Sequence, residues 1–159
     1  MKNVLRNITV LFVTLLLVFS VETYSQAKEQ VIGKIISASE ANQLFGPPLK
    51  SFTINPKMVL MLTKRSPEYI MFNIINDKIV VLDARRKVLH PDGLTVAAQT
   101  QFHLFSTSKV LELLDLIGSN ILTLQIRANN ILTITGDELT EEDGSVLEFS
   151  RNCPPVCWD

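Results

Sequence analysis

Two stretches of the chain alternate apolar and polar residues with the period of two that is typical of a β-strand. The first is 121–127 and the second is 131–135. A three-residue loop at 128–130 aligns their two apolar faces, whereas a two-residue loop would set the leucines of one strand beside the threonines of the other. We therefore predict a hairpin with one buried face, one solvated face and a left-handed backbone at Asn130.

A second pair of strands is apolar on both faces. Residues 69–75 and 78–84 flank Asn76 and Asp77, two residue types that tolerate the left-handed backbone of a tight hairpin turn. Strands that are apolar on both faces are typical of the middle of a sheet. The pattern predicts a central hairpin with other parts of the domain packed on each side.

The clearest helix covers 109–117, where the apolar residues form one stripe. Ser108 is available to cap its start, and Gly118 can end it. Asn55, followed by a proline, can cap a helix over 57–64, although the solid apolar run there also fits a buried strand. The remaining elements are short and bounded by turn-forming residues: strands over 31–36, 51–54, 101–105 and 146–149, a helix over 40–45 capped by Ser37 or Ser39, a turn at 90–93, and an acidic loop at 136–144.

These elements predict a single compact α+β domain over 28–159. We expect an antiparallel, or mostly antiparallel, sheet of about six or seven strands with two or three helices packed on it. The residues after the last strand form a tail that contains the cysteines. The chain shows no internal repeat and no long linker.

The start of the chain has the organisation of a secretory signal peptide. Lys2 and Arg6 give a positive start, 8–21 is almost entirely apolar, and Ser25 and Ala27 supply the small side chains that a signal peptidase needs. An uncleaved membrane anchor is the alternative, but the apolar run is shorter than the roughly 20 residues of a spanning helix. We predict cleavage after Ala27, which makes 1–27 a signal peptide, and a secreted or periplasmic protein.

The charge of the chain bears on its partners. Cleavage would change the formal net charge from −1 to −2, because Lys2, Arg6 and Glu22 are removed. This near-neutral balance offers no basic surface for nucleic acid, and no later apolar stretch is long enough to span a membrane. The expected partner is therefore an unidentified protein or a small ligand, with no cofactor and no metal.

The end of the chain carries its two cysteines, Cys153 and Cys157, in the sequence CPPVCWD. Two cysteines in an exported chain favour a disulfide. An extended segment between them would hold their Cα atoms about 12 Å apart, whereas a disulfide needs less than about 7 Å. We therefore expect the intervening prolines to form a turn and the disulfide to fasten the tail.

Three alternatives for the cysteines stay open: thiol–disulfide exchange, a bridge to another chain, and a metal site completed by His90 and His103. The spacing is C-x-x-x-C, not the C-x-x-C of thioredoxin-like enzymes, and nothing in the sequence places either histidine near the tail. Trp158 follows the pair. It either docks on the domain or inserts into a partner, since tryptophan is enriched at binding hot spots.

The remaining charged clusters and motifs of the sequence do not predict a catalytic or metal site. Basic clusters at 64–65 and 85–87 flank the central hairpin, and they form either a solvated loop surface or a modest anion-binding patch at its open end. The chain lacks the G-x-S-x-G motif of serine hydrolases, and its acidic cluster lacks the spacing of a calcium loop. We predict no catalytic residue, and the candidates for ligand or partner contact are Arg85, Arg86, His90 and Trp158.

The leading hypothesis is thus a small exported binding or accessory module without catalysis. The first alternative is an extracytoplasmic thiol–disulfide redox protein that uses Cys153 and Cys157. The second is a ligand-binding protein with a pocket between the sheet and helix 109–117.

Overall fold

The computed structural model describes residues 30–118, 120–136, 144–148 and 150–153, without the side chain of Cys153. The chain divides into two units, Met1–Gln30 and Val31–Asp159, and the second contains all the helices and strands that the structure describes. The signal peptide, most of the acidic loop, Cys157 and Trp158 lie outside the described residues.

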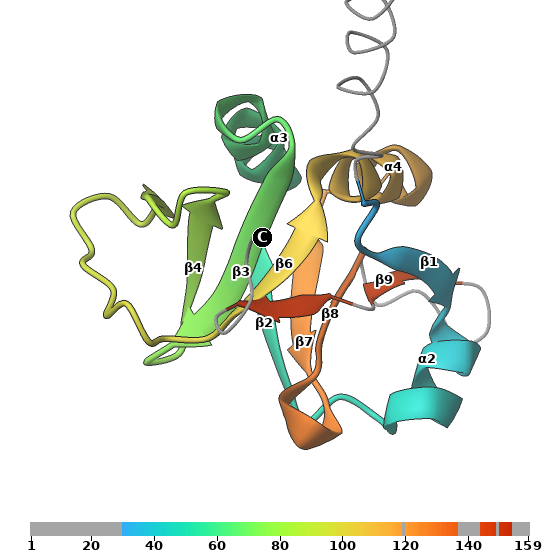
Figure 1. Ribbon diagram of the computed structural model, residues 1–159. Helices are drawn as coiled ribbons and strands as arrows, with labels where there is room; N and C mark the ends of the chain where they lie inside the picture. The colour runs from blue at the N-terminus through green and yellow to red at the C-terminus, as the bar shows by residue number, and fades with distance from the viewer. Residues whose placement is uncertain (1–29, 119, 137–143, 149, 154–159) are drawn as a thin grey trace, which may run out of the picture. The chain divides into compact units, whose positions relative to one another are not determined.

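Within the described residues, the fold is α+β, with two antiparallel five-stranded sheets and three α-helices (Figure 1). The strands of the first sheet, called sheet A, are in order β1 (Lys34–Ser37), β9 (Ser145–Glu148), β8 (Leu132–Thr135), β7 (Leu122–Ile126) and β2 (Lys50–Ile54). Those of the second, sheet B, are β10 (Arg151–Cys153), β6 (Phe102–Ser106), β3 (Tyr69–Ile75), β4 (Lys78–Asp83) and β5 (Val88–His90). The helices are α2 (Ala38–Phe45), α3 (Pro56–Arg65) and α4 (Thr107–Ile117), and a 3-10 turn, η1 (Ala128–Asn130), joins β7 to β8.

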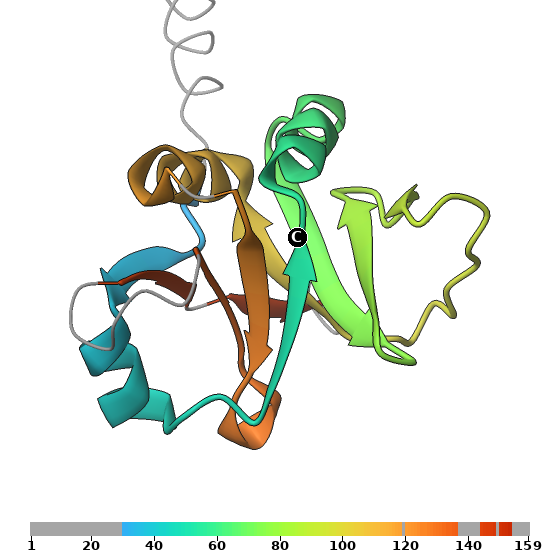
Figure 2. The same ribbon diagram turned by 180° about the vertical axis from the view of Figure 1, so that it is seen from behind.

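The prediction of an α+β fold is confirmed, but the prediction of one sheet of about six or seven strands is wrong. The inner faces of both sheets share one core, in which Phe72 of sheet B and Leu124 of sheet A belong to the same cluster. Helices α3 and α4 lie together at one end of the sheets in both views (Figures 1 and 2), so they cannot cover a whole sheet face. The inner, apolar face of each sheet is therefore covered mostly by the inner face of the other sheet.

The central hairpin β3–β4 is confirmed. Ile75 pairs with Lys78, and Asn76 and Asp77 have φ angles of 51° and 57°. One face of the hairpin contributes to the core shared by the sheets, where Phe72 meets the edge of the Phe105 ring at a centroid distance of 6.2 Å. The other face forms a separate buried cluster of Ile32, Tyr69, Met71, Val80, Leu82, Phe102 and Leu104.

The three-residue loop between β7 and β8 is also confirmed. The Arg127 N–H donates to the Ile131 carbonyl at 2.9 Å, and both Asn129 and Asn130 adopt a left-handed backbone, with φ of 58° and 57°. The prediction that the second face of this hairpin is solvated is wrong. Thr133 on that face is fully buried, because the C-terminal end of α2 is hydrogen-bonded to the same face through Arg127.

The helix starts follow the predicted caps in two of three cases. Ser37 Oγ accepts a hydrogen bond from the Glu40 N–H at 3.1 Å, and Asn55 Oδ1 accepts one from the Lys57 N–H at 2.8 Å. The segment 57–64 is thus a helix, not a buried strand. Helix α4 begins before Ser108, with Ser106 at the N-cap position, and Gly118 ends it in a left-handed conformation as predicted.

Two strands are absent from the predictions, β5 and β10. Each has three residues, which is too short for a period of two to stand out. Their partners define them, since β5 pairs with β4 and β10 pairs with β6. In the described part of the chain, no helix combines the length and the apolar character that crossing a membrane requires.

Candidate functional site

An open groove of about 490 Å³ lies between sheet B and β2, which is one of the two edge strands of sheet A. Residues 51–54 of β2 form one wall. Residues 77–79, at the turn into β4, and the pair His90 and Pro91 form the other. His90, which was predicted to be a turn residue and a candidate contact, is thus the last residue of β5 and part of this groove.

Among the described residues, no strand pairs with β2 on the side away from β7, so the backbone hydrogen-bonding groups on that free edge are unused. In an antiparallel sheet, a middle strand bonds alternately to its two neighbours. The Arg127 N–H donates to the Ile131 carbonyl on the β8 side, whereas the Ile126 carbonyl accepts a hydrogen bond from Leu49 on the β2 side. By alternation, Ile126, Leu124 and Leu122 are the residues of β7 that bond to β2. Ser51 and Thr53 pair with the intervening residues of β7, so their own N–H and C=O groups are directed away from it.

The charges around the groove nearly balance. Lys50 Nζ lies 3.6 Å from Asp77 Oδ1, and both side chains are well exposed, so this ion pair adds little stability. Lys78 adds an exposed cation and His90 a half-buried imidazole. Ser51 and Thr53 are exposed, whereas Ile54 is buried in the shared core. The groove therefore combines a polar backbone edge with an apolar floor.

A smaller pocket, of about 160 Å³, lies where α2, η1, β6 and β10 approach one another. We call it the polar pocket, and its lining comprises Phe45, His103, Asn129, Asn130, Ile131, Ser150 and Asn152. His103 belongs to the predicted strand 101–105, which is β6, and its side chain is only 3% exposed. Burial lowers the pKa of its imidazole to about 4, so the ring is neutral at pH 7.

His103 and Ser150 have the residue types of a base and a nucleophile. Their Nδ1 and Oγ atoms lie 3.0 Å apart, within hydrogen-bond distance. Among the described residues, no carboxylate is hydrogen-bonded to the ring to orient it, as the third member of a catalytic triad would be. A base with so low a pKa also has little driving force to accept a proton near pH 7, so this pair is better suited to binding than to catalysis.

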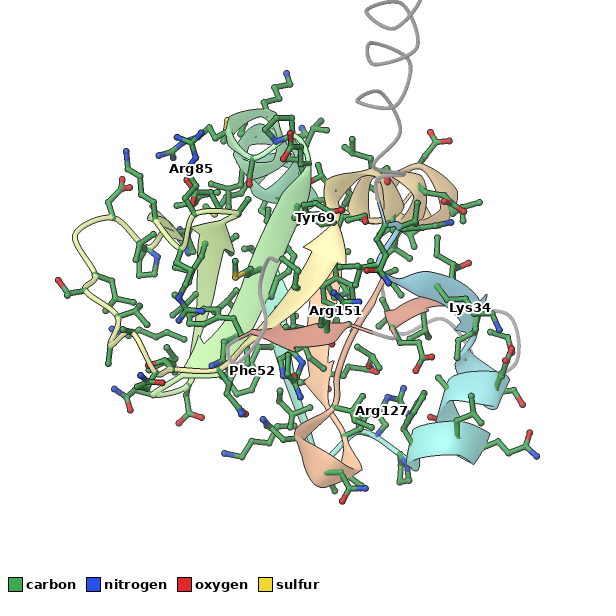
Figure 3. All side chains as sticks on the ribbon, viewed as in Figure 1. Lys34, Phe52, Tyr69, Arg85, Arg127 and Arg151 are labelled. Carbon is green, nitrogen blue, oxygen red and sulfur yellow. The ribbon has the colours of Figure 1, made fainter. Side chains whose placement is uncertain are left out.

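Arg127 is the largest buried side chain with a charge. It is 2% exposed and lies between the β7–β8 strands and α2 (Figure 3). Its guanidinium donates to four acceptors: Thr133 Oγ1 at 3.0 Å, Asn42 Oδ1 at 2.8 Å, Gln125 Oε1 at 2.9 Å, and the Gly46 carbonyl. Burial lowers the pKa of Arg127, and the charge of Glu148 opposes that effect. Arg127 therefore fastens the C-terminal end of α2 to sheet A.

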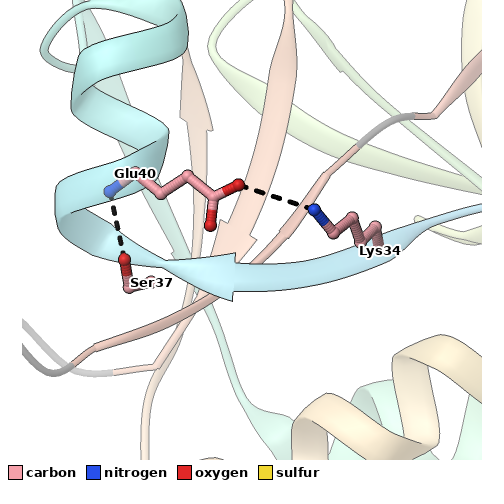
Figure 4. A network of polar contacts seen from close by, with 3 residues as sticks. All are labelled: Lys34, Ser37 and Glu40. Atoms are coloured by element: carbon pink, nitrogen blue, oxygen red, sulfur yellow. Dashed lines mark hydrogen bonds and ion pairs between the residues drawn. The ribbon is translucent and has the colours of Figure 1, made fainter.

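Glu148 is the corresponding buried acid. It lies in β9 with no exposed surface, and neither of its carboxylate oxygens has a hydrogen-bond partner among the residues that the structure describes. The pKa of the Glu148 carboxyl is raised to about 7, mainly by burial and then by the charge of Glu40, while Lys34 and Arg127 act in the opposite direction. Figure 4 shows Lys34 and Glu40 joined at 3.5 Å beside the start of α2.

The basic clusters at 64–65 and 85–87 each contribute one arginine to a hollow at the open end of the β3–β4 hairpin. Arg65 and Arg85 line this hollow of about 280 Å³, which also contains the acidic residues Glu68 and Asp83. Arg85 is exposed (Figure 3). Arg86 is engaged within the fold, since it donates to the Thr100 carbonyl at 2.8 Å and lies over the Phe102 ring.

The other predicted residues are not brought to one place. In the described residues, no group of three or more His, Cys, Asp or Glu is arranged to hold a metal ion. His90 lies in the groove and His103 in the polar pocket. The backbone of Cys153 belongs to β10, and Cys157 and Trp158 lie beyond the described part of the chain.

The sequence did not single out Arg127, Glu148 or Ser150. Arg127 belongs to the face of its hairpin that was predicted to be solvated. Glu148 lies in the predicted strand 146–149, where a charged residue is expected to be exposed. The sequence carries no signal that marks Arg127 as buried, since Thr123 and Gln125 occupy the other positions on its side of the strand. Comparisons with protein-family models, with curated proteins and with solved structures returned no match.

Proposed function

We propose that the protein is a small exported binding module without catalysis, and that it holds an extended segment of a partner protein in the groove beside β2. The observation that carries this proposal is the free edge of β2 along one wall of the groove. An extended peptide can add a strand to such an edge through main-chain hydrogen bonds, and side-chain pockets then select the sequence.

Several features support this mode of binding. Ser51 and Thr53 offer backbone donors and acceptors at a spacing of two residues, which matches the repeat of an extended strand. Ile54 on one wall and Ile79 on the other provide apolar surface in the groove, and His90 lies on the same wall as Ile79. An unpaired edge is a liability for aggregation unless it is protected or used, and a partner strand satisfies the same groups.

Binding is tested by selecting peptides from a library of displayed unstructured heptapeptides and titrating an enriched peptide by fluorescence anisotropy. Thr53→Pro removes one N–H at the free edge without removing a bond to β7. It should weaken binding by about tenfold or more, the effect of losing one or two hydrogen bonds. Amide exchange at Ser51 and Thr53 should slow when the peptide is added.

The matched control is Thr53→Ala, which removes the same side chain but keeps the N–H. Its affinity should stay within about threefold of the wild type, and thermal unfolding of both variants checks that they fold. Equal affinities for the proline and alanine variants would show that the edge is not used. Failure to enrich any peptide would also count against the proposal.

We further propose that the protein acts in the periplasm or outside the cell, after cleavage behind Ala27, and that Cys153 and Cys157 form a disulfide. The mass of the protein recovered from the exported fraction is expected to correspond to a chain that begins at Lys28 and lacks one hydrogen per cysteine. Thiol reagents should add no mass before reduction. A mass that includes 1–27, or labelling without reduction, would contradict these two proposals respectively.

A further inference from the structure

The polar pocket has an uncharged lining. The seven lining residues that the structure describes include no lysine, arginine, aspartate or glutamate. The one titratable side chain, His103, is neutral at pH 7 because burial lowers its pKa to about 4. Asn129, Asn130 and Asn152 are exposed, so a bound ion would stay partly hydrated, but these lining residues offer it no countercharge in place of the water it loses. The pocket therefore favours a neutral ligand.

The same lining is dense in groups that both donate and accept hydrogen bonds. In sheet B, Phe72 pairs with His103, and His103 pairs with Asn152. Along these three neighbouring positions the side chains change from the apolar core, at Phe72, to the polar pocket, at His103 and Asn152. Asn129 and Asn130 approach from η1, and Ser150 from the connection between β9 and β10. Each carboxamide presents two donors and an acceptor with two lone pairs.

The pocket is also small. Its volume of about 160 Å³ is below the roughly 300–1,000 Å³ of sites for drug-sized ligands. It can accept one small ring but not an oligomer. Phe45 and Ile131 form the apolar part of the wall, against which the C–H groups of a ring can pack.

From this lining we propose that the polar pocket binds a single neutral sugar ring. Hydroxyl groups match the lining because each of them donates and accepts, as the asparagine, serine and neutral histidine side chains do. The site is separate from the groove beside β2, since the two share no lining residue. Binding here does not depend on the proposed peptide function.

The test is a titration of the exported protein by ligand-observed NMR and calorimetry. The neutral probes are glucose, galactose, mannose and N-acetylglucosamine, and the charged probes are glucuronate and glucosamine. We expect at least one neutral sugar to bind, with charged analogues at least about tenfold weaker. The double variant N129G/N130G should weaken that binding about tenfold or more, since it removes two hydrogen-bonding groups.

Glycine is the right replacement because both asparagines have positive φ, which glycine adopts without strain. Asn76→Gly is the matched control, since it makes the same change at a hairpin residue with φ of 51° outside the pocket. Its sugar affinity should equal that of the wild type. The proposal is overturned if no neutral sugar binds, if charged analogues bind as well, or if N129G/N130G and N76G behave alike.

Discussion

Replacing Arg127 by alanine is expected to lower the free energy of unfolding by about 3–5 kcal/mol, because each buried acceptor left unpaired costs about 1–3 kcal/mol. The guanidinium reaches Asn42 and Gly46 of the α2 end and Thr133 of β8. Its removal leaves these acceptors unpaired and takes away a cation that favours ionised Glu148. Urea denaturation at pH 7 measures the change directly.

Two companion variants show whether the loss comes from the Arg127 site. Arg85→Ala removes an exposed arginine and should change the free energy of unfolding by no more than about 0.5 kcal/mol. Arg127→Lys keeps the charge but lacks the planar group that reaches several acceptors at once, so its loss should be intermediate. A loss at Arg127→Ala no larger than at Arg85→Ala would show that Arg127 does not fasten α2.

The second large effect concerns Glu148 and pH. Burial raises the pKa of its carboxyl from 4.5 to about 7 in the folded protein, so the folded state binds the proton more tightly than the unfolded state does. Stability from this group is therefore complete below about pH 4.5 and is lost as the pH rises through 7. The total loss is about 3 kcal/mol, because each tenfold difference in proton affinity corresponds to about 1.4 kcal/mol.

Glu148→Gln imitates the protonated acid and cannot ionise. The free energy of unfolding of this variant should lack the decline between pH 4.5 and 8, so the variant should be more stable than the wild type at pH 8. At pH 4 the two should be similar, because both side chains are then neutral. Urea denaturation at several pH values gives both curves.

The charges that act on Glu148 come from three elements: Lys34 of β1, Glu40 of α2 and Arg127, which follows β7. Glu112→Gln is the matched control, since it makes the same change at an exposed glutamate of α4. The control should keep the decline. If Glu148→Gln keeps it too, Glu148 is not the group that titrates.

Local features of the fold were predictable because their causes lie within a few residues. Asn76 and Asn130 adopt the left-handed backbone that their side chains tolerate, and Asn55 caps α3 in front of its proline. The loop at 128–130 followed from the need to align two apolar faces. The same reasoning failed at Ser108, because the sequence offered several adjacent cap residues and the helix begins at Thr107.

The candidate sites were much less predictable. His90 was singled out, but the groove around it depends on β2 lying opposite the start of β4, and these segments are far apart in the sequence. His103 was assigned to a strand, but its neutral, buried state depends on the strands and helix around it. Ser150 and Asn152 enter the polar pocket because β10 pairs with β6, and no periodic pattern predicts a strand of three residues.

The sequence by itself determined the hairpins, two of the helix starts and the α+β class, since period, turn residues and caps act locally. The tertiary structure decided the number of sheets and the surroundings of each polar residue. Arg127 lies on the polar side of an alternating strand, yet it is buried, and so is Glu148. Alternation reports which side of a strand a residue occupies, and only the packing of distant elements determines whether that side meets water.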